Sequence, residues 1–321
     1  MIYISTDSTD VFYNFAAEYY FASEKLLGED AFMLWSTTPT LMIGKFQNTL
    51  EEIDLGYARE HGITVSRRLS GGGCIYTDMG GRQFSYIAKS NGIEIEFERF
   101  ISPIVNVLRS LGAEASLTGR NDITVCGRKV SGNTQYKQGC MTVHHGSLLF
   151  STDIDELVRS ATPNPYKITS KSLSSVRQRV ANISDFIDKS VTLQDFSSII
   201  INSLVDDEYV ISGDDDKRIR EIAKEKFAKE DFIYATSPKF EIEKTFHIKA
   251  GTFKLSYSVQ DGVIKGVGIS GDFFSGVDLC DMEKALTGCT FTPECVRNAL
   301  SVFDGRIYLT DSEELARAIF E

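Results

Sequence analysis

An arginine, a hydroxyl and three consecutive glycines form the first group of residues that could do chemistry. Arg68, Ser70 and Gly71–Gly73 stand at the end of Ile63–Ser70, which alternates like a strand. Because neighbouring side chains of a strand face opposite sides, Arg68 and Ser70 point together, away from the apolar side, and Arg67 falls at the edge of that side. Glycine has no Cβ, so a ligand can lie directly against backbone N–H groups. The combination of an arginine, a hydroxyl and a glycine loop suits an anionic ligand, and phosphate is the most favoured candidate.

Two well-known phosphate-binding loops do not fit this run. A P-loop would close with Gly-Lys-Ser/Thr, and a dinucleotide fingerprint would lead into a helix, whereas a strand-like run follows here. A glycine hairpin between two strands, with the arginines in solvent, is the structural alternative. The run by itself therefore fits both an anion site and a plain turn.

A second polar group surrounds a predicted hairpin. Gly119-Arg120-Asn121-Asp122 precedes two short strands, 123–125 and 129–131, which flank a turn at Cys126-Gly127-Arg128. Lys129 and Ser131 are predicted to share one face of the second strand. A solvated hairpin lysine is the ordinary interpretation of Lys129 alone.

Two adjacent histidines follow on a further predicted strand, 144–150. Neighbours on a strand point to opposite faces, so His144 and His145 are not expected to share a metal ion. We interpret them as strand residues with ordinary hydrogen bonds.

The length and composition of the chain exclude several classes of function. The 321 residues suffice for two domains, and a net charge of −11 argues against non-specific nucleic-acid binding. No apolar run is long enough to span a membrane, and the N-terminus does not resemble a signal peptide. The six cysteines are scattered without a C-x-x-C pair, which predicts a reducing, cytoplasmic location and no zinc site.

The remaining sequence must supply the elements that position these residues. Further strands are predicted at 1–6, 31–35, 40–43 and 84–88, with 31–35 and 40–43 joined as a hairpin across Pro39. Helices are predicted at 9–26, 51–61, 96–111, 192–204 and 214–229. The polar loop from Thr162 to Arg179, which contains Lys171, is either a solvated connector or a lid over an anion.

A change of pattern after Ser237-Pro238 predicts a domain boundary. Three alternating strands at 240–248, 252–259 and 263–269 precede short helices at 278–287 and 292–302. We therefore predict a catalytic domain at residues 1–240 and a small α+β domain at 241–321.

Taken together, these segments resemble lipoate–protein ligase from about residue 1 to 302. The resemblance rests on motifs that occur in the family's order: Gly44-x-Phe46-Gln47-Asn48, Arg68-x-Ser70-Gly71-Gly72-Gly73, Gly119-Arg120-Asn121-Asp122, Arg128-Lys129-Val130-Ser131-Gly132, His144-His145-Gly146, and Lys171 with Ser175-Val176-Arg177. Each motif alone is weak evidence for the family, but their occurrence together in the same order is strong evidence. Residues 303–321 lie outside the match.

The resemblance implies a fold and a reaction. The large domain would be a mixed-sheet α/β domain similar to biotin ligases and class II aminoacyl-tRNA synthetases. The enzyme would be an ATP-dependent, AMP-forming ligase that uses ATP and Mg²⁺ to convert lipoate to lipoyl-adenylate. It would then modify one lysine of an acceptor lipoyl domain, in a 2-oxoacid dehydrogenase subunit or the glycine-cleavage H protein. A monomer is the default expectation.

The resemblance also assigns residues. Lys129 would be catalytic, binding the lipoyl carbonyl and the α-phosphate, and Asp122 would face Mg²⁺, since carboxylates suit that ion. Lys171 would lie on the adenylate-binding loop. The residues implied to bind lipoate or the adenylate are Arg68, Ser70, Gly71, Gly72, Gly73, Cys74, Ile75, Thr77, Asn121, Asp122, Ser131, His145, Gly146 and Lys171.

Some positions depart from the family's pattern, and two other functions remain open. Thr77 stands where a histidine is expected, Gly81 where an asparagine is expected, and Tyr136 where an arginine is expected. The first alternative is an octanoyl- or lipoyl-transferase of the same fold that uses a cysteine thioester without ATP, with Cys140 as the candidate. The second is a non-catalytic protein that binds lipoate or the adenylate.

Overall fold

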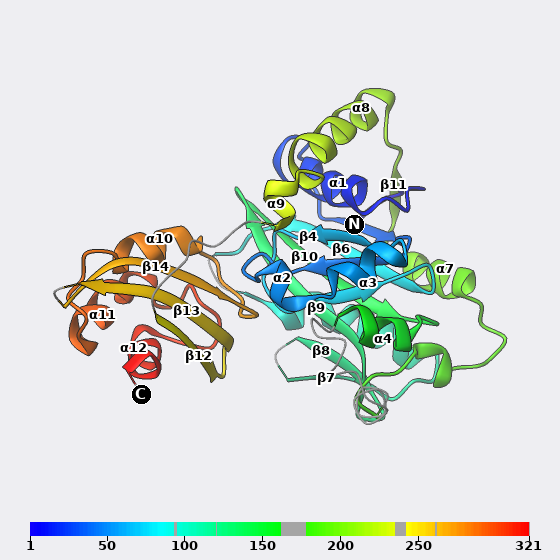
Figure 1. Ribbon diagram of the computed structural model, residues 1–321. Coiled ribbons are helices and arrows are strands. Elements are labelled where there is room, and N and C mark those ends of the chain that lie inside the picture. The colour runs from blue at the N-terminus through cyan, green and yellow to red at the C-terminus, as the bar shows by residue number, and fades with distance from the viewer. Residues whose placement is uncertain (93–94, 120, 162–177, 235–241, 261, 321) are drawn as a thin grey trace.

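The computed structural model describes residues 1–92, 95–119, 121–161, 178–234, 242–260 and 262–320, which form a larger and a smaller domain (Figure 1). Among these residues, eight strands form one mixed sheet in the larger domain. In sheet order they are β11 (Asp207–Tyr209), β1 (Ile2–Ile4), β2 (Ala31–Trp35), β6 (Gly81–Lys89), β10 (Met141–Leu149), β9 (Arg128–Gln138), β8 (Asp122–Val125) and β7 (Ala115–Thr118). The strand β1 runs parallel to β11 and β2, and the other neighbours are antiparallel.

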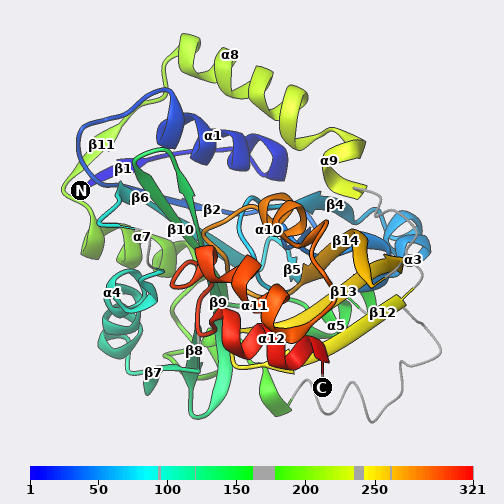
Figure 2. The same ribbon diagram turned by 90° about the vertical axis from the view of Figure 1, so that its left-hand side faces the viewer.

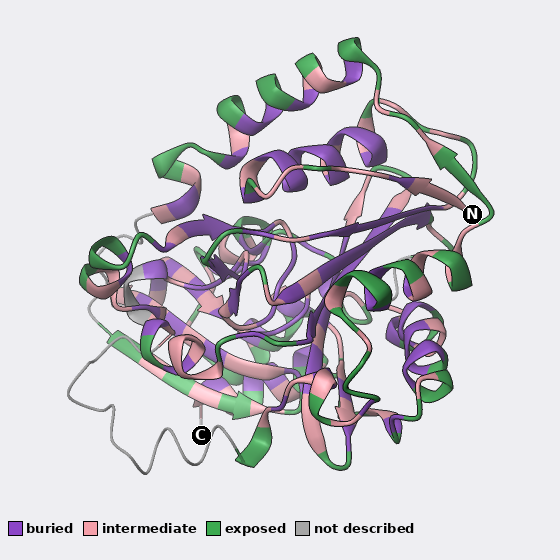
Figure 3. Ribbon diagram, turned by 90° about the vertical axis from the view of Figure 1, so that its right-hand side faces the viewer, coloured by how far each residue is buried: buried purple, intermediate pink, exposed green. Residues whose placement is uncertain are grey.

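Helices cover both faces of this sheet. One face carries α1 (Val11–Ser23), outside which lie α8 (Gly213–Ile222) and a π-helical turn, η3 (Ala223–Phe227) (Figure 1). The helix α1 is mostly buried, whereas the outer side of α8 is exposed (Figure 3). Asp10 caps α1 by accepting a hydrogen bond from the Phe12 N–H. This burial makes α1 a fixed wall behind the sheet.

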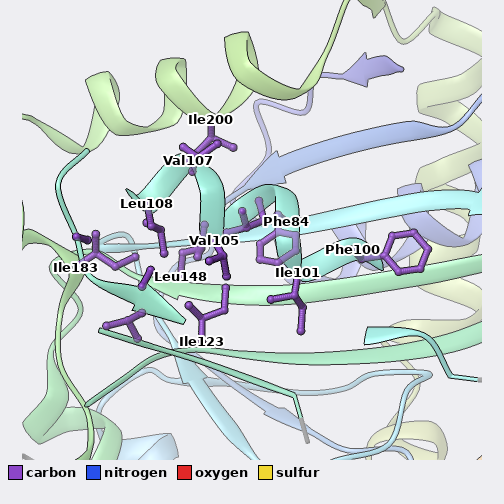
Figure 4. Packing of buried hydrophobic residues seen from close by; sticks show 14 of the residues in the cluster. Phe84, Phe100, Ile101, Val105, Val107, Leu108, Ile123, Leu148, Ile183 and Ile200 are labelled. Atoms are coloured by element: carbon purple, nitrogen blue, oxygen red, sulfur yellow. The ribbon is translucent and has the colours of Figure 1, made fainter. Parts of the chain in front are cut away.

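The opposite face carries α4 (Phe97–Ser110) and α7 (Leu193–Leu204). Ile101, Val105 and Leu108 of α4 are buried with Phe84 and Leu148 of the sheet (Figure 4). The helix continues through Pro103. Burial of this apolar stripe outweighs the loss of one backbone hydrogen bond at proline.

A smaller sheet corrects one prediction. The strand β3 (Thr40–Ile43) lies between β4 (Thr64–Arg67) and β5 (Ile75–Thr77), and it does not pair with β2. The predicted hairpin across Pro39 is therefore wrong. Both runs are buried along their whole length, and such runs carry no alternation that would indicate a partner. Short helices complete this region: α2 (Thr49–Glu52), α3 (Leu55–Glu60), α5 (Ile154–Ser160) and α9 (Glu230–Tyr234). A further short helix, η2 (Ile183–Asp185), packs with α4 on the large sheet.

The smaller domain is an antiparallel meander with helices on one face (Figure 2). Its elements are β12 (Ile242–Ile248), β13 (Gly251–Gln260), β14 (Val263–Gly271), α10 (Leu279–Leu286), α11 (Pro293–Leu300), η4 (Ser301–Phe303) and α12 (Ser312–Phe320). The helix α12 lies in the stretch beyond the sequence resemblance, and it packs on α11 and β12. The predicted α/β catalytic domain with a small α+β domain is thus confirmed, while the boundary at 240/241 falls at the edge of the undescribed residues 235–241 and stays a prediction.

The smaller domain packs against the glycine run of the larger one. The rings of Phe46 and Phe273 stack with centroids 5.3 Å apart, and the Gly72 N–H donates to the Phe273 carbonyl at 3.3 Å. Lys45 forms an ion pair with Asp278 across the same boundary. The described part of the chain contains no helix long and apolar enough to cross a membrane.

Candidate active site

A cavity lies between the glycine run, the α1 side of the large sheet, and the smaller domain. Its walls combine apolar side chains with amides, hydroxyls and one ammonium group, and Phe274 comes from the smaller domain. The lining residues are Phe15, Trp35, Met42, Arg68, Gly72, Gly73, Cys74, Ile75, Gln83, Asn121, Lys129, Gly132, Asn133, Thr134, His145, Gly146, Ser147 and Phe274.

The structure brings together most of the residues predicted for the site. Those that line the cavity are Arg68, Gly72, Gly73, Cys74, Ile75, Asn121, Lys129, His145 and Gly146. The predicted residues that do not line it are Ser70, Gly71, Thr77, Asp122 and Ser131. Lys171 lies outside the described residues. The sequence did not single out Phe15, Trp35, Gln83 or Phe274.

Lys129 reaches the cavity because of a β-bulge. The pairing of β8 with β9 shifts register between Ile123 and Thr124, so Val130 is an extra residue. Sequence alternation predicted that Lys129 and Ser131 share a face, but the bulge breaks that alternation. Lys129 instead lies over Gly132, where an added Cβ would be 3.3 Å from Nζ, and Ser131 is buried. The bulge therefore directs the ammonium group to the cavity.

Asp122 is the ion partner of Lys129. Its Oδ1 lies 2.8 Å from Lys129 Nζ, and both side chains are partly exposed, so neither charge is locked in the interior. Among the described residues no cluster of three or more His, Cys, Asp or Glu side chains could hold a metal ion. Mg²⁺ is often bound by one or two carboxylates together with substrate phosphates. Asp122 fits that mode, in which ATP itself would supply the remaining oxygens.

The glycines of the loop have different structural roles. A Cβ on Gly71 would collide with the backbone of Phe273, and Gly72 has a φ of +91°, which other residues rarely adopt. Gly73 has open space where its Cβ would be. The first two glycines thus form the loop and its contact with the smaller domain, and the third leaves room for a ligand beside the backbone.

Arg68 is held by the loop rather than by an acidic side chain. Its guanidinium donates to the carbonyls of Met42 at 2.7 Å, Gly71 at 2.9 Å and Gly73 at 2.6 Å. Burial lowers the pKa of Arg68 to about 10. The alternative that places the arginines in solvent is wrong for Arg68, which is 3% exposed. Arg68 fixes the shape of the glycine loop and exposes part of its side chain to the cavity.

A buried hydrogen-bond chain passes behind the cavity floor. His145 Nε2 lies 2.7 Å from Ser70 Oγ, and its Nδ1 lies 3.1 Å from Glu18 Oε2. Glu18 also accepts a hydrogen bond from Ser85, whose hydroxyl accepts from the Trp35 indole at 3.0 Å. The chain connects the glycine loop with the wall at Trp35 and fixes the orientation of His145. Glu18 was missed, although it is the one charged residue in the otherwise uncharged helix α1.

His144 belongs to the opposite face of β10. Its ring stacks on Phe100 with centroids 4.9 Å apart, and burial lowers its pKa well below the usual value. The two histidines therefore lie on opposite sides of the sheet, as their adjacency predicted, and His144 is a neutral core residue.

Replacing Gly146 by alanine should destabilise the protein. An added Cβ would lie 2.6 Å from Cζ of the fully buried Phe84 and would also collide with Asn133. Overpacking of this kind costs about 1–3 kcal/mol of unfolding free energy, which urea denaturation would measure. Gly213→Ala is a suitable control, because nothing lies within 4 Å of its added Cβ and it begins the helix α8. Equal stability of Gly146→Ala and wild type would contradict the close packing of β6, β9 and β10.

Two cysteines bear on the thioester alternative. Cys140 is exposed in the turn between β9 and β10 and does not line the cavity. Cys74 lines the cavity, but burial raises the pKa of its thiol to about 12. A thiol with such a pKa is a poor nucleophile near neutral pH. Neither position favours covalent catalysis by cysteine.

Comparison with known sequence families identifies both domains. The Lipoyl protein ligase A/B catalytic domain family matches residues 10–205, and the Bacterial lipoate protein ligase C-terminus family matches residues 237–319. Lipoate–protein ligase 1 of Staphylococcus aureus is 36% identical over 317 residues, which cover 97% of each chain. Lipoate-protein ligase LplJ of Bacillus subtilis is 37% identical over 295 residues, which cover 89% of each chain.

Solved structures share the fold. LipL1 of P. falciparum, determined in complex with lipoate, superposes with a TM-score of 0.82 at 19% identity and covers 99% of this chain and 98% of its own. A bi-partite lipoate protein ligase of Thermoplasma acidophilum, studied with its E2 lipoyl domain, gives a TM-score of 0.67 at 25% identity over 75% of this chain and 98% of its own. A lipoate-protein ligase A bound with ATP gives 0.63 at 24% identity over 73% of this chain and 98% of its own.

Proposed function

Because the chain belongs to the lipoate–protein ligase family, we propose that it activates lipoate with ATP as lipoyl-adenylate and then transfers the lipoyl group to a lysine of an acceptor lipoyl domain. The observation that carries this proposal is the position of Lys129 at a cavity that also has apolar walls, which Phe15, Trp35 and Phe274 contribute to. An apolar cavity suits a fatty acyl chain, and an ammonium group suits the carboxylate and phosphate that must react.

The first step joins two anions. A carboxylate does not acylate an amine unaided, so a carboxylate oxygen of lipoate attacks the α-phosphorus of ATP and pyrophosphate leaves. Lys129 Nζ would neutralise charge on the phosphate oxygens as the new bond forms, and fixed positive charge is an effective form of catalysis in such a site. The open space beside Gly73 supports placing the adenylate against the loop backbone.

Magnesium would act with ATP in this step. We propose that Asp122 contributes a carboxylate oxygen to Mg²⁺ while ATP phosphates provide others, so that the ion neutralises phosphate charge. The Lys129–Asp122 contact supports this arrangement, because it places the carboxylate next to an ammonium group that lines the cavity.

The second step transfers the acyl group to protein. The acceptor lysine amine would attack the acyl carbon, AMP would leave with the phosphate oxygen, and an amide would remain. A lipoyl domain of a 2-oxoacid dehydrogenase subunit is the proposed acceptor, supported by the E2 lipoyl domain named with the Thermoplasma acidophilum ligase. The glycine-cleavage H protein is a second proposed acceptor, from the family resemblance.

Pyrophosphate release tests the proposal directly. Purified protein with MgATP and lipoate should release pyrophosphate only when lipoate is present, and an added lipoyl domain should gain the mass of one lipoyl group on its acceptor lysine. Acyl transfer from an acyl-carrier protein without pyrophosphate release would instead establish the thioester transferase. Lipoate binding without either activity would establish the non-catalytic alternative.

The cysteines provide a separate prediction. Iodoacetamide at pH 8 should label the exposed Cys126, Cys140 and Cys280 of the native protein but not Cys74, whose raised pKa keeps it protonated. Mass spectrometry of the digested protein would measure labelling at each site. Cys140→Ala should also retain ligation, whereas loss of ligation in this variant without a loss of stability would support a thioester mechanism.

We propose that a monomer in the cytoplasm performs the reaction. The free state of all six cysteines supports a reducing compartment, and one chain supplies both the sheet and the Phe274 wall of the cavity. Light scattering of the purified protein would test the monomer, since a stable dimer would double the measured mass.

A further inference from the structure

Three cross-strand neighbours form part of the cavity floor. In the large sheet Trp35 of β2 is paired with Gln83 of β6, and Gln83 is paired with Ser147 of β10. All three line the cavity. On β9, the Gly132 N–H donates to Ser147 Oγ at 3.4 Å, and Lys129 lies over Gly132. Along this row the floor changes from an indole, through an amide and a hydroxyl, to an ammonium group.

Gln83 is buried without a partner in the described part of the chain. Its side chain is 3% exposed, and its enclosed Oε1 accepts no hydrogen bond from any described residue. Such an amide has a desolvation cost that an apolar side chain of similar volume would not have. The polar groups next to it are engaged, because Ser85 donates to Glu18 and His145 lies between Glu18 and Ser70. A buried amide retained beside a cavity in spite of this cost points to a role for its N–H group, which no described residue accepts from, in binding a ligand.

We propose that Gln83 recognises the carboxyl group of the acyl substrate, an inference that rests on the function proposed above. Gln83 lines the cavity, and in this proposal its amide N–H donates to a carboxylate oxygen of lipoate and later to the carbonyl oxygen of the adenylate.

The neighbours of Gln83 explain why the ligand group is a carboxyl. Ser147 Oγ already accepts from Gly132, so its O–H remains able to donate. Two neutral donors beside the ammonium group of Lys129 fit an anion. Trp35, on the other side of Gln83, is a surface for an apolar chain. In this arrangement the acyl chain contacts Trp35, and Gln83 binds the carboxyl group at the end of that chain.

Calorimetric titration of Gln83→Met tests the inference without ATP or acceptor. The two probes are lipoate and the primary alcohol in which CH₂OH replaces its carboxylate. We expect Gln83→Met to bind lipoate roughly 10- to 100-fold more weakly than wild type, the effect of losing a hydrogen bond to a charged group. Affinity for the alcohol should change much less. The Tm of Gln83→Met should equal or exceed that of wild type, because methionine removes an unpaired buried amide.

The matched control is Gln135→Met. Gln135 is 4% exposed and its Oε1 also lacks a partner among the described residues, but it does not line this cavity. Its substitution should leave lipoate affinity unchanged. Unchanged lipoate affinity of Gln83→Met, equal losses for both probes, or a lowered Tm that accounts for the loss would overturn the inference. If wild type bound neither probe, the acyl assignment of the cavity and the proposed function would fall with it.

Discussion

Lys129→Ala should lose lipoate-dependent pyrophosphate release by about 100- to 1,000-fold while keeping its fold. Removing one group that stabilises transition-state charge typically has an effect of that size. The expected effect on stability is small, because the side chains of Lys129 and Asp122 are 42% and 32% exposed. Steady-state pyrophosphate release, together with thermal unfolding, would measure both quantities.

Lys189→Ala is the matched control for this substitution. Lys189 belongs to the same domain, and its Nζ lies 3.9 Å from Asp185 on the surface, so the variant also removes an exposed ion pair. It should retain wild-type turnover. Turnover of Lys129→Ala equal to that of Lys189→Ala would contradict a catalytic Lys129, and a lowered Tm in Lys129→Ala alone would assign the loss to misfolding.

The sequence identified residues that line the cavity better than it paired the elements that carry them. The hairpin of β8 and β9 followed from its turn and its short alternating strands, and His144 and His145 occupy opposite faces as their adjacency required. The runs 31–35 and 40–43 were correctly predicted as strands, yet they belong to different sheets. Continuous apolar runs show that a strand is buried, but they do not show which strand lies beside it.

The features of the site that the sequence did not predict depend mainly on contacts between segments that are distant in the chain. The Ser70–His145–Glu18 contacts join residues separated by up to 127 positions, and no local pattern encodes such a contact. The bulge at Val130 is another case, because one extra residue reverses which side chains share a face. A single charge in the apolar helix α1 was the available signal for Glu18.

Arg67 is a further residue whose contacts with distant segments could not be predicted from the strand pattern. Strand alternation placed Arg67 at the edge of the apolar side, whereas the structure buries it to 4% exposure. Its Nη1 donates to the Gly44 and Gln47 carbonyls, each at 2.8 Å, and its Nη2 and Nε donate to the Ile233 carbonyl at 3.0 and 3.2 Å. Burial lowers the pKa of Arg67 to about 10. One guanidinium thus connects the 44–47 turn with α9.

Arg67→Met should therefore lower the free energy of unfolding by about 3–5 kcal/mol, because it leaves several buried carbonyls without donors. Urea denaturation would measure the change. Arg67→Lys should recover only part of it, since an ammonium group cannot reproduce the planar fork of donors. Arg220→Met is the control, because it removes an exposed ion pair with Asp216 and should change stability little. If Arg67→Met were as stable as Arg220→Met, the hydrogen bonds of Arg67 would not hold the turn and α9 together, and the apolar edge predicted from the strand pattern would describe this position better.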